Sequence, residues 1–329
     1  MSGVITGQPG QGYPNRGREI ETAGVALWAA NLAHPVNGLD GWLSLVDDLM
    51  RDAKAQGASL FVMPEYASAH WLAQAPKSLK PTEIVGWMAD EGTRALPKLQ
   101  ALAVKHDLAV VAGSMPIRRA PGPRPVDGPD FLNRSWILLP DGKGGLETLS
   151  HDKLVLTPAE QDPQGWSLAK GRHLRVATWR GLRFVVLICL DIEMPGVAQM
   201  LIDRDIDLVL VPSMTGQLSG YHRVFDCAKA RAVELFAVVG TVGCIGQAGI
   251  GGIDGNCSGA AFFVPCEAAF GATGLIDRLG PFTEVEGSGP LLVSILPVGE
   301  LRRARRAGAE VWQGRFDTDH LVVEDKARA

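Results

Sequence analysis

The sequence is poor in cysteine and has no cysteine pair at a spacing typical of disulfides or metal sites. Its five cysteines lie at positions 189, 227, 244, 257 and 266. This odd count, without a CxxC pair or a zinc-like arrangement with histidine, favours free thiols in a reducing, cytoplasmic setting. It also predicts no metal site.

Long apolar runs are missing too. The two most apolar segments, around 184–190 and 235–246, are shorter than the ~20 residues that a membrane-spanning helix needs. They are therefore expected to be buried strands. Residues 1–23 lack the charged start and apolar run of a secretory signal, which predicts a flexible tail. We expect no membrane association.

Positive charge is not in excess. The chain has 32 Lys and Arg against 36 Asp and Glu, a net charge of -4, which predicts no nucleic-acid partner. GxGxxG and phosphate-loop motifs are missing as well, so no nucleotide cofactor is expected. The one basic cluster lies in a predicted C-terminal helix and is expected to be a solvated or salt-bridged face; it comprises Arg302, Arg303, Arg305 and Arg306.

The residues that are present predict a soluble α/β domain. Hydrophobic residues make up 46% and charged residues 21% of the chain, as in globular proteins with a sizeable core. Apolar runs alternate with segments of helical spacing and with loops rich in Pro and Gly. Strands are predicted at 24–32, 59–65, 107–115, 134–140, 145–149, 180–189, 207–213 and 235–245, helices at 39–56, 82–106, 194–204 and 221–235, and loops at 118–130 and 156–171.

Two rounds of strand, helix and strand occur, one in each half of the chain, with hairpin strands between them. Continuous apolar strands such as FVVLIC and LVLVP are typical of a sheet that is covered on both faces. We therefore predict one domain with two similar layers, in which each sheet meets helices on one face and the other sheet on its second face.

Cys189 ends the apolar run VVLIC and precedes a polar segment. A thiol at such a strand end can lie near free backbone N–H groups, which is the geometry that a nucleophile and its oxyanion require. A lone cysteine in an apolar strand is nevertheless more commonly a buried structural residue. A catalytic thiol also needs a base or a positive neighbour, and none of the seven histidines forms a recognisable pair with it.

Two further strand ends carry ionisable groups. Glu65 ends FVMPE, and Lys153 follows a predicted strand in LSHDKLVLTPAE. Each residue alone fits a surface or salt-bridged position. Together with a thiol they form a chemical set, because a carboxylate can accept the thiol proton while an ammonium group stabilises an oxyanion. Lys153 beside Glu65 is also expected to keep that carboxylate ionised.

Three segments, taken together, resemble a known family. MPEY at 63–66, HDKLVLTPAE at 151–160 and ICLDIEMP at 188–195 resemble, in order and spacing, the three signature blocks of the nitrilase superfamily of carbon-nitrogen hydrolases. The resemblance extends over about residues 24–297. It implies a catalytic triad of Glu65, Lys153 and Cys189, with Glu160 orienting the lysine and the substrate, although a solvated loop acid is the alternative for Glu160.

The resemblance also implies an architecture. It predicts a single-domain α-β-β-α sandwich over 24–297 that pairs into a four-layer homodimer or a higher homo-oligomer. The extension 298–329 is expected to reach a subunit interface, with Trp312 and Phe316 as contacts. By position, the backbone N–H of Leu190 is expected to be the second oxyanion donor.

The residues after the nucleophile bear on the reaction. Amide and carbamoyl hydrolases of this family tend to carry Cys, any residue, Asp, whereas nitrilases carry Cys, Trp, Glu; here the residues are Cys189, Leu190 and Asp191. This favours hydrolysis of a small amide, without cofactor or metal, through a thioester. N-carbamoyl hydrolysis, nitrile hydrolysis, acyl transfer and a catalytically silent scaffold on the same fold remain alternatives.

The substrate pocket is less readable. Loops 66–81, 118–130, 156–171 and 213–222 are expected to hold the specificity, because they lie at the same strand ends as the triad. His70, Trp71 and Met214 are expected to approach the pocket. Glu193 could bind a substrate amine or equally form a structural salt bridge.

Overall fold

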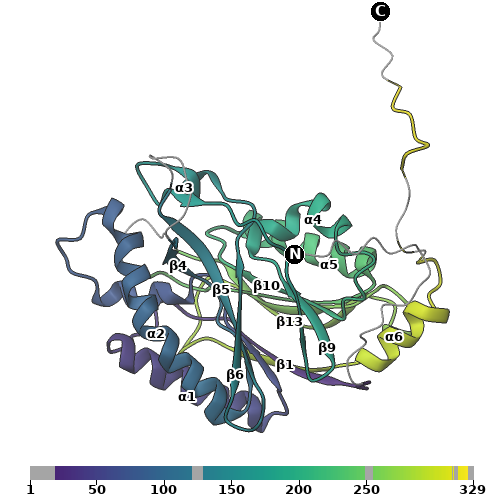
Figure 1. The fold of residues 1–329 in the computed structure, drawn as a ribbon, viewed down its shortest axis with the longest axis horizontal. Coiled ribbons are helices and arrows are strands. Elements are labelled where there is room, and N and C mark those ends of the chain that lie inside the picture. The colour runs from purple at the N-terminus through teal and green to yellow at the C-terminus, as the bar shows by residue number, and fades with distance from the viewer. Residues whose placement is uncertain (1–18, 121–128, 249–254, 313, 315–317, 325–329) are drawn as a thin grey trace, which may run out of the picture.

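The computed structural model describes residues 19–120, 129–248, 255–312, 314 and 318–324. The polypeptide forms two β-sheets that pack face to face between helices. Figure 1 shows α1 and α2 on one side of the sheets and α4 and α5 on the other. This arrangement confirms the predicted α-β-β-α sandwich.

The first sheet has 8 strands, in the order β14-β1-β2-β3-β5-β4, with β6 and β7 also pairing with β5. Its centre, β1-β2-β3, is parallel, and β14 and β5 flank it in antiparallel pairing. The strands are β1 (Ala23–Trp28), β2 (Leu60–Val62), β3 (Ala109–Val111), β4 (Met115–Arg118), β5 (Phe131–Pro140), β6 (Leu146–Asp152), β7 (Leu168–Ala169) and β14 (Leu291–Leu296).

The second sheet has 6 strands, in the order β13-β12-β11-β10-β9-β8. Here β9, β10 and β11 are parallel, and antiparallel strands close both sides. The strands are β8 (Val176–Trp179), β9 (Leu182–Val186), β10 (Leu208–Ser213), β11 (Val238–Gly243), β12 (Ser258–Phe263) and β13 (Leu275–Phe282).

Helices cover the outer faces of both sheets. α1 packs against α2, and α2 contacts β4 and β5 of the first sheet, whereas α5 lies over β11 and β12 of the second. The helices are α1 (Gly38–Ala55), α2 (Ile84–His106), α3 (Pro158–Gln161), α4 (Pro195–Gln199), α5 (Leu218–Leu235) and α6 (Val298–Ala307), with short 3-10 turns η1 (Ala67–Gln74), η2 (Pro81–Glu83), η3 (Cys189–Glu193) and η4 (Ala268–Phe270).

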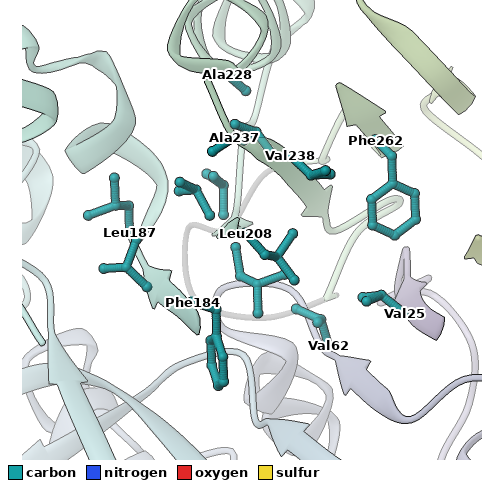
Figure 2. Close-up of a cluster of buried hydrophobic side chains, with 14 of the residues drawn as sticks. Val25, Val62, Phe184, Leu187, Leu208, Ala228, Ala237, Val238 and Phe262 are labelled. Carbon is teal, nitrogen blue, oxygen red and sulfur yellow. The ribbon is translucent and has the colours of Figure 1, made fainter. Parts of the chain in front are cut away.

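Alternation along the strands creates two separate cores. In β1, Val25 and Leu27 face the second sheet, whereas Ala26 and Trp28 face α1 and α2. Figure 2 shows Val25 and Val62 of the first sheet pointing toward residues of the second, with Phe262 nearby. The two sheets therefore bury one common apolar layer, as the continuous apolar strands predicted.

Several predicted elements were wrong in detail. The strand predicted at 107–115 is interrupted at Gly113, which has a φ of +56°. The helix predicted at 194–204 ends after α4, and the loop predicted at 156–171 contains α3 and β7. Strands β8, β12, β13 and β14 were not predicted. β8 and β13 contain polar or charged residues and β12 contains small residues, which weakens the apolar pattern, whereas β14 (LLVSIL) is an apolar run that the prediction overlooked.

The first part of the segment after residue 297, residues 298–312, packs onto its own chain. Val298 and Leu301 of α6 join the core between the sheets. The Trp312 indole donates to the backbone carbonyl of Glu234 at 3.0 Å and contacts the Phe236 ring. Phe316, the other aromatic residue expected at a subunit contact, lies outside the described residues.

Three of the four arginines in the basic cluster on α6 form ion pairs, which matches the salt-bridged alternative. Arg302 contacts Asp207 at 2.6 Å, and Arg303 contacts Glu21 at 2.9 Å. Arg305 donates to the backbone carbonyl of Phe236 at 2.8 Å. Among the residues that the structure describes, no helix combines the length and the apolar character that a membrane crossing needs.

Candidate active site

The three residues of the predicted triad lie where strands end. Glu65 follows β2, Lys153 follows β6 and Cys189 follows β9. The Lys153 Nζ lies 2.8 Å from Glu65 Oε1 and 2.8 Å from Glu160 Oε2. Lys153 and Glu65 expose only 2% and 1% of their surface, so this ammonium is paired away from bulk water.

Close packing of the backbone places Glu65. The residue before it, Pro64, has its carbonyl oxygen against Gly113, and a Cβ at Gly113 would lie 2.0 Å from that oxygen. Tyr66 follows in a left-handed conformation with a φ of 51°. The chain is therefore held against Gly113 just before the carboxylate and turns just after it.

Glu160 is held as an anion by its own helix end. Its Oε2 accepts hydrogen bonds from the Thr157 N–H at 2.9 Å and the Thr157 hydroxyl at 3.0 Å, which completes a capping box at the start of α3. The Tyr66 hydroxyl donates to Oε1 at 2.9 Å. Burial raises the pKa of Glu160, but Lys153 and these donors outweigh it and lower the pKa below its ordinary value.

Asn133 connects the two carboxylates. Its Nδ2 donates to Glu65 Oε1 at 2.9 Å and to Glu160 Oε1 at 3.2 Å. Its backbone carbonyl accepts from the Lys153 backbone N–H at 2.9 Å, so one residue of β5 contacts both carboxylates and the backbone of Lys153. Asn133 was not predicted as a site residue, because it lies one position before the strand predicted at 134–140; the available signal was an amide residue at the start of that strand.

Cys189 is the first residue of η3 and adopts a φ of 48°, a left-handed conformation that is unfavourable for a residue with a side chain. Its Sγ donates to the Met214 carbonyl at 3.8 Å, and the Met214 N–H donates to Glu65 Oε2 at 3.0 Å. The backbone of Met214 therefore contacts both the thiol and the carboxylate.

Burial dominates the electrostatics of this site. It raises the pKa of the Cys189 thiol well above its ordinary value, and the Glu65 charge raises it further. Burial also raises the pKa of Glu65, and this effect exceeds the opposing effect of the Lys153 charge. For Lys153, burial lowers the pKa, but the charge of Glu65 outweighs it and raises the pKa.

The protonation states follow from these shifts. The resting thiol is neutral, and the Lys153 ammonium stays charged between two carboxylates. Glu65, with a raised pKa, is a stronger base than an exposed glutamate. Glu65 can therefore accept the proton of the Cys189 thiol while the sulfur attacks an electrophile.

Leu190 is the second residue of η3, after Cys189. N–H groups in the first turn of a helix have no acceptor within that helix. The Leu190 N–H thus belongs to the class of donor that can bind a developing oxyanion. Its use by a substrate is part of the proposal below.

Two residues expected at the pocket lie in the core instead. His70 is buried, contacts the backbone carbonyl of Asn31 at 2.7 Å and stacks on Trp28, and burial lowers its pKa. Trp71 packs edge-on against Trp42 of α1. Both residues belong to η1, whose buried side chains pack against α1 and α2.

The other two pocket residues lie close to the site. Met214 contributes backbone contacts to Cys189 and Glu65, and its side chain is half-buried in an apolar cluster with Tyr66 and Trp166. Glu193, at the end of η3, lies 3.4 Å from Arg223 of α5, which matches the salt-bridge alternative. All five cysteines, each within a described segment, are free thiols.

Curated relatives share part of this chain. A probable hydrolase, YhcX, from Bacillus subtilis (strain 168) is 28% identical over 211 residues, which span 63% of this chain and 37% of that protein. An (R)-stereoselective amidase from Pseudomonas sp is 30% identical over 151 residues, spanning 45% of this chain and 48% of the amidase. The chain thus spans less than half the length of these two relatives.

Solved structures share the fold. An amidase from Nesterenkonia sp. superposes with a TM-score of 0.61 at 23% identity, covering 89% of this chain and 97% of the amidase. A variant of that amidase, carrying the acetamide moiety of fluoroacetamide on its active-site cysteine, gives a TM-score of 0.62 at 24% identity, covering 90% and 97%. The family model of the carbon-nitrogen hydrolases matches residues 25–258. The chain therefore belongs to the carbon-nitrogen hydrolase family.

Proposed function

We propose that this protein hydrolyses a small non-peptide amide, through a thioester on Cys189, with Glu65 as the general base and Lys153 as the electrostatic catalyst. The observation that carries the proposal is the buried ion pair between Lys153 and Glu65, joined to the thiol through the backbone of Met214. A scaffold gains nothing from two buried carboxylates and an ammonium beside a free thiol, because such groups are costly to desolvate.

The first half-reaction forms the thioester. Cys189 Sγ attacks the amide carbon while its proton passes to Glu65, and the carbonyl oxygen becomes an oxyanion between the Lys153 ammonium and the Leu190 N–H. Glu65 then gives the proton to the leaving nitrogen. The carbon–nitrogen bond breaks, and ammonia or an amine is released.

The second half-reaction restores the enzyme. Water enters and gives a proton to Glu65 as its oxygen attacks the thioester carbon. The carbon–sulfur bond breaks, and Glu65 returns the proton to the sulfur of Cys189. The products are a carboxylic acid and the free thiol, and the cycle needs no metal or organic cofactor.

Three substrate classes remain to be separated by experiment. The (R)-stereoselective amidase and the amidase folds favour amides. Asp191, two residues after Cys189, also favours an amide or a carbamoyl group over a nitrile. A carbamoyl substrate would release carbon dioxide with ammonia, whereas a nitrile would first add water.

The test is ammonia release from aliphatic, aromatic, ω-amido and N-carbamoyl compounds and from matched nitriles. We expect release from amides that is lost in Cys189→Ala and kept in Cys227→Ala, which removes a half-buried thiol of α5. Hydrolysis that survives in Cys189→Ala would overturn the proposed nucleophile. If only nitriles are hydrolysed, the proposed function would be nitrile hydrolysis and not amide hydrolysis.

We also propose that the protein assembles as a homodimer or a higher homo-oligomer in a reducing compartment. Exposed apolar side chains on and beside the outer helices support self-association, namely Met200, Leu218 and Val233. Five free thiols fit a reducing compartment. Analytical ultracentrifugation across protein concentrations tests the assembly, and a monomer at every concentration would contradict it.

A further inference from the structure

The Asp191 carboxylate lies beneath the site, fully buried, and contacts two separate stretches of backbone. Its Oδ1 accepts the N–H groups of Leu154 at 3.0 Å and Val155 at 2.8 Å. Its Oδ2 accepts the Ile188 N–H at 3.0 Å and lies 3.2 Å from Nε2 of His151. Four donors therefore converge on one side chain.

These donors flank the residues that do the chemistry. Leu154 follows Lys153, Ile188 precedes Cys189, and His151 lies two residues before Lys153. Lys153 and Cys189 come from different sheets, since β6 pairs in the first and β9 in the second. The Asp191 carboxylate thus joins the end of one sheet to the end of the other at the point where the two side chains must meet.

The connection through Asp191 also stabilises the strained turn at Cys189. A left-handed conformation at a residue with a side chain persists only where surrounding contacts hold it. Asp191 accepts the N–H directly before that residue and so fixes the turn that presents the thiol and the Leu190 N–H.

We propose that Asp191 is a positioning residue, which sets the location of the Cys189 sulfur relative to Lys153. His151 orients the Asp191 carboxylate. The proposal rests on the function proposed above. A carboxylate suits this role because its two oxygens only accept, and all four groups around it can donate. In Asp191→Asn, one carboxylate oxygen is replaced by an amide NH₂ group, which would face an N–H donor without an acceptor between them. A simple turn cap would contact Ile188 alone, whereas Asp191 also reaches a segment 36 residues away.

The test measures the reactivity of the thiol without any substrate. Iodoacetamide alkylation is followed separately at Cys189 and at the exposed Cys266 by peptide mass spectrometry, in the wild type, Asp191→Asn and Asp191→Ala. We expect alkylation of Cys189 to slow by roughly 10- to 100-fold in both variants, since a displacement of about 1 Å costs on the order of 100-fold in rate. Alkylation of Cys266 should not change, and kcat should fall with Cys189 reactivity while KM changes little.

Matched variants separate positioning from stability. Asp152→Asn makes the same chemical change at the end of β6, at a partly exposed pair with Arg134, and should leave Cys189 reactivity unchanged. If the Asp191 variants do not fold, two variants of His151 take their place. His151→Leu removes the His151 donor to the Asp191 carboxylate, and His151→Gln restores a donor at the same position. We expect His151→Leu to slow alkylation several-fold and His151→Gln to recover most of the loss.

Folded Asp191→Asn protein with a lowered Tm but wild-type alkylation and kcat would overturn the inference and leave Asp191 a structural residue. Equal alkylation rates in His151→Leu and His151→Gln would likewise remove His151 from it. Glu65→Gln identifies failure of the proposed function itself, because alkylation that does not depend on Glu65 would mean that Glu65 is not the base. The positioning role would then fall with the function.

Discussion

At the scale of single residues, burial is the property that makes this site chemically useful. The raised pKa of Glu65 makes the carboxylate a better proton acceptor, and the raised pKa of Cys189 keeps the thiol protonated until an electrophile arrives. Lys153 stays charged because two carboxylates surround it. The account therefore predicts proton transfer at the moment of attack in place of a preformed thiolate.

The proposed protonation states of Glu65, Cys189 and Lys153 predict how kcat/KM depends on pH. Glu65 must be ionised to accept the thiol proton, and its pKa lies above the ordinary 4.5, so kcat/KM should fall as pH drops through a value above 4.5. The pKa of Lys153 lies above its ordinary 10.5, so the ammonium causes no loss on the alkaline side below that pH. Rates measured from about pH 5 to about pH 10 should show one acid limb and a plateau. An alkaline limb near neutrality would contradict these protonation states.

Removal of Lys153 should also destabilise the fold. Lys153→Met leaves Glu65 and Glu160 buried without their cation, and the loss of one partner from a buried ion pair costs about 3–5 kcal/mol. The control is Lys105→Met, whose pair with Asp47 lies at the surface and contributes about 0–1 kcal/mol. Urea unfolding measures both variants. Equal urea midpoints for Lys153→Met and Lys105→Met would contradict this prediction, because they would show that water compensates for the lost Lys153 ammonium.

At the scale of elements, the proposed reactive groups lie just after the ends of three strands, β2, β6 and β9. The sequence indicated two of these ends, because the apolar runs of β2 and β9 are followed by Glu65 and Cys189. β6 contains polar residues and extends to Asp152, beyond the strand predicted at 145–149. The sequence could not predict what those ends contact. Asn133 in β5 and the Met214 backbone after β10 are brought in by strand pairing and by the approach of two sheets, and neither leaves a local pattern.

Gly113 provides a test at this scale. Gly113→Ala would put a Cβ 2.0 Å from the Pro64 oxygen, beside Glu65, at a φ of +56°. Gly144→Ala is the matched control, because its φ is +95° with nothing within 4 Å of the added atom. We expect Gly113→Ala to lose more than about 1 kcal/mol of unfolding free energy beyond the control and to lower kcat. Equal effects on stability and kcat would show that the close approach to Pro64 is unimportant.

At the scale of the whole molecule, the layer between the sheets makes the domain one folding unit. Phe184 of β9 lies fully buried in the same layer as Val25 and Val62 of the first sheet. Phe184→Ala should cost about 3–5 kcal/mol. Unfolding monitored by tryptophan fluorescence and by far-ultraviolet circular dichroism should remain one coincident transition. Two separated transitions would show that the sheets unfold independently.

The sandwich and the family could be predicted from the sequence, because continuous apolar strands and three spaced motifs carry them. The later strands could not, since β13 exposes much of its surface and β12 contains Gly and Ala residues. Position along the chain also misplaced His70 and Trp71. Both follow Glu65 closely, but η1 turns their side chains into the core.

The most direct test of the account is detection of the acyl-enzyme. The protein is mixed with an amide that it hydrolyses, quenched in acid within one turnover and analysed by intact and peptide mass spectrometry. We predict an added mass equal to the acyl group on the peptide that contains Cys189, and none in Cys189→Ala. Hydrolysis with no adduct at any quench time, or an adduct on another residue, would contradict the thioester mechanism.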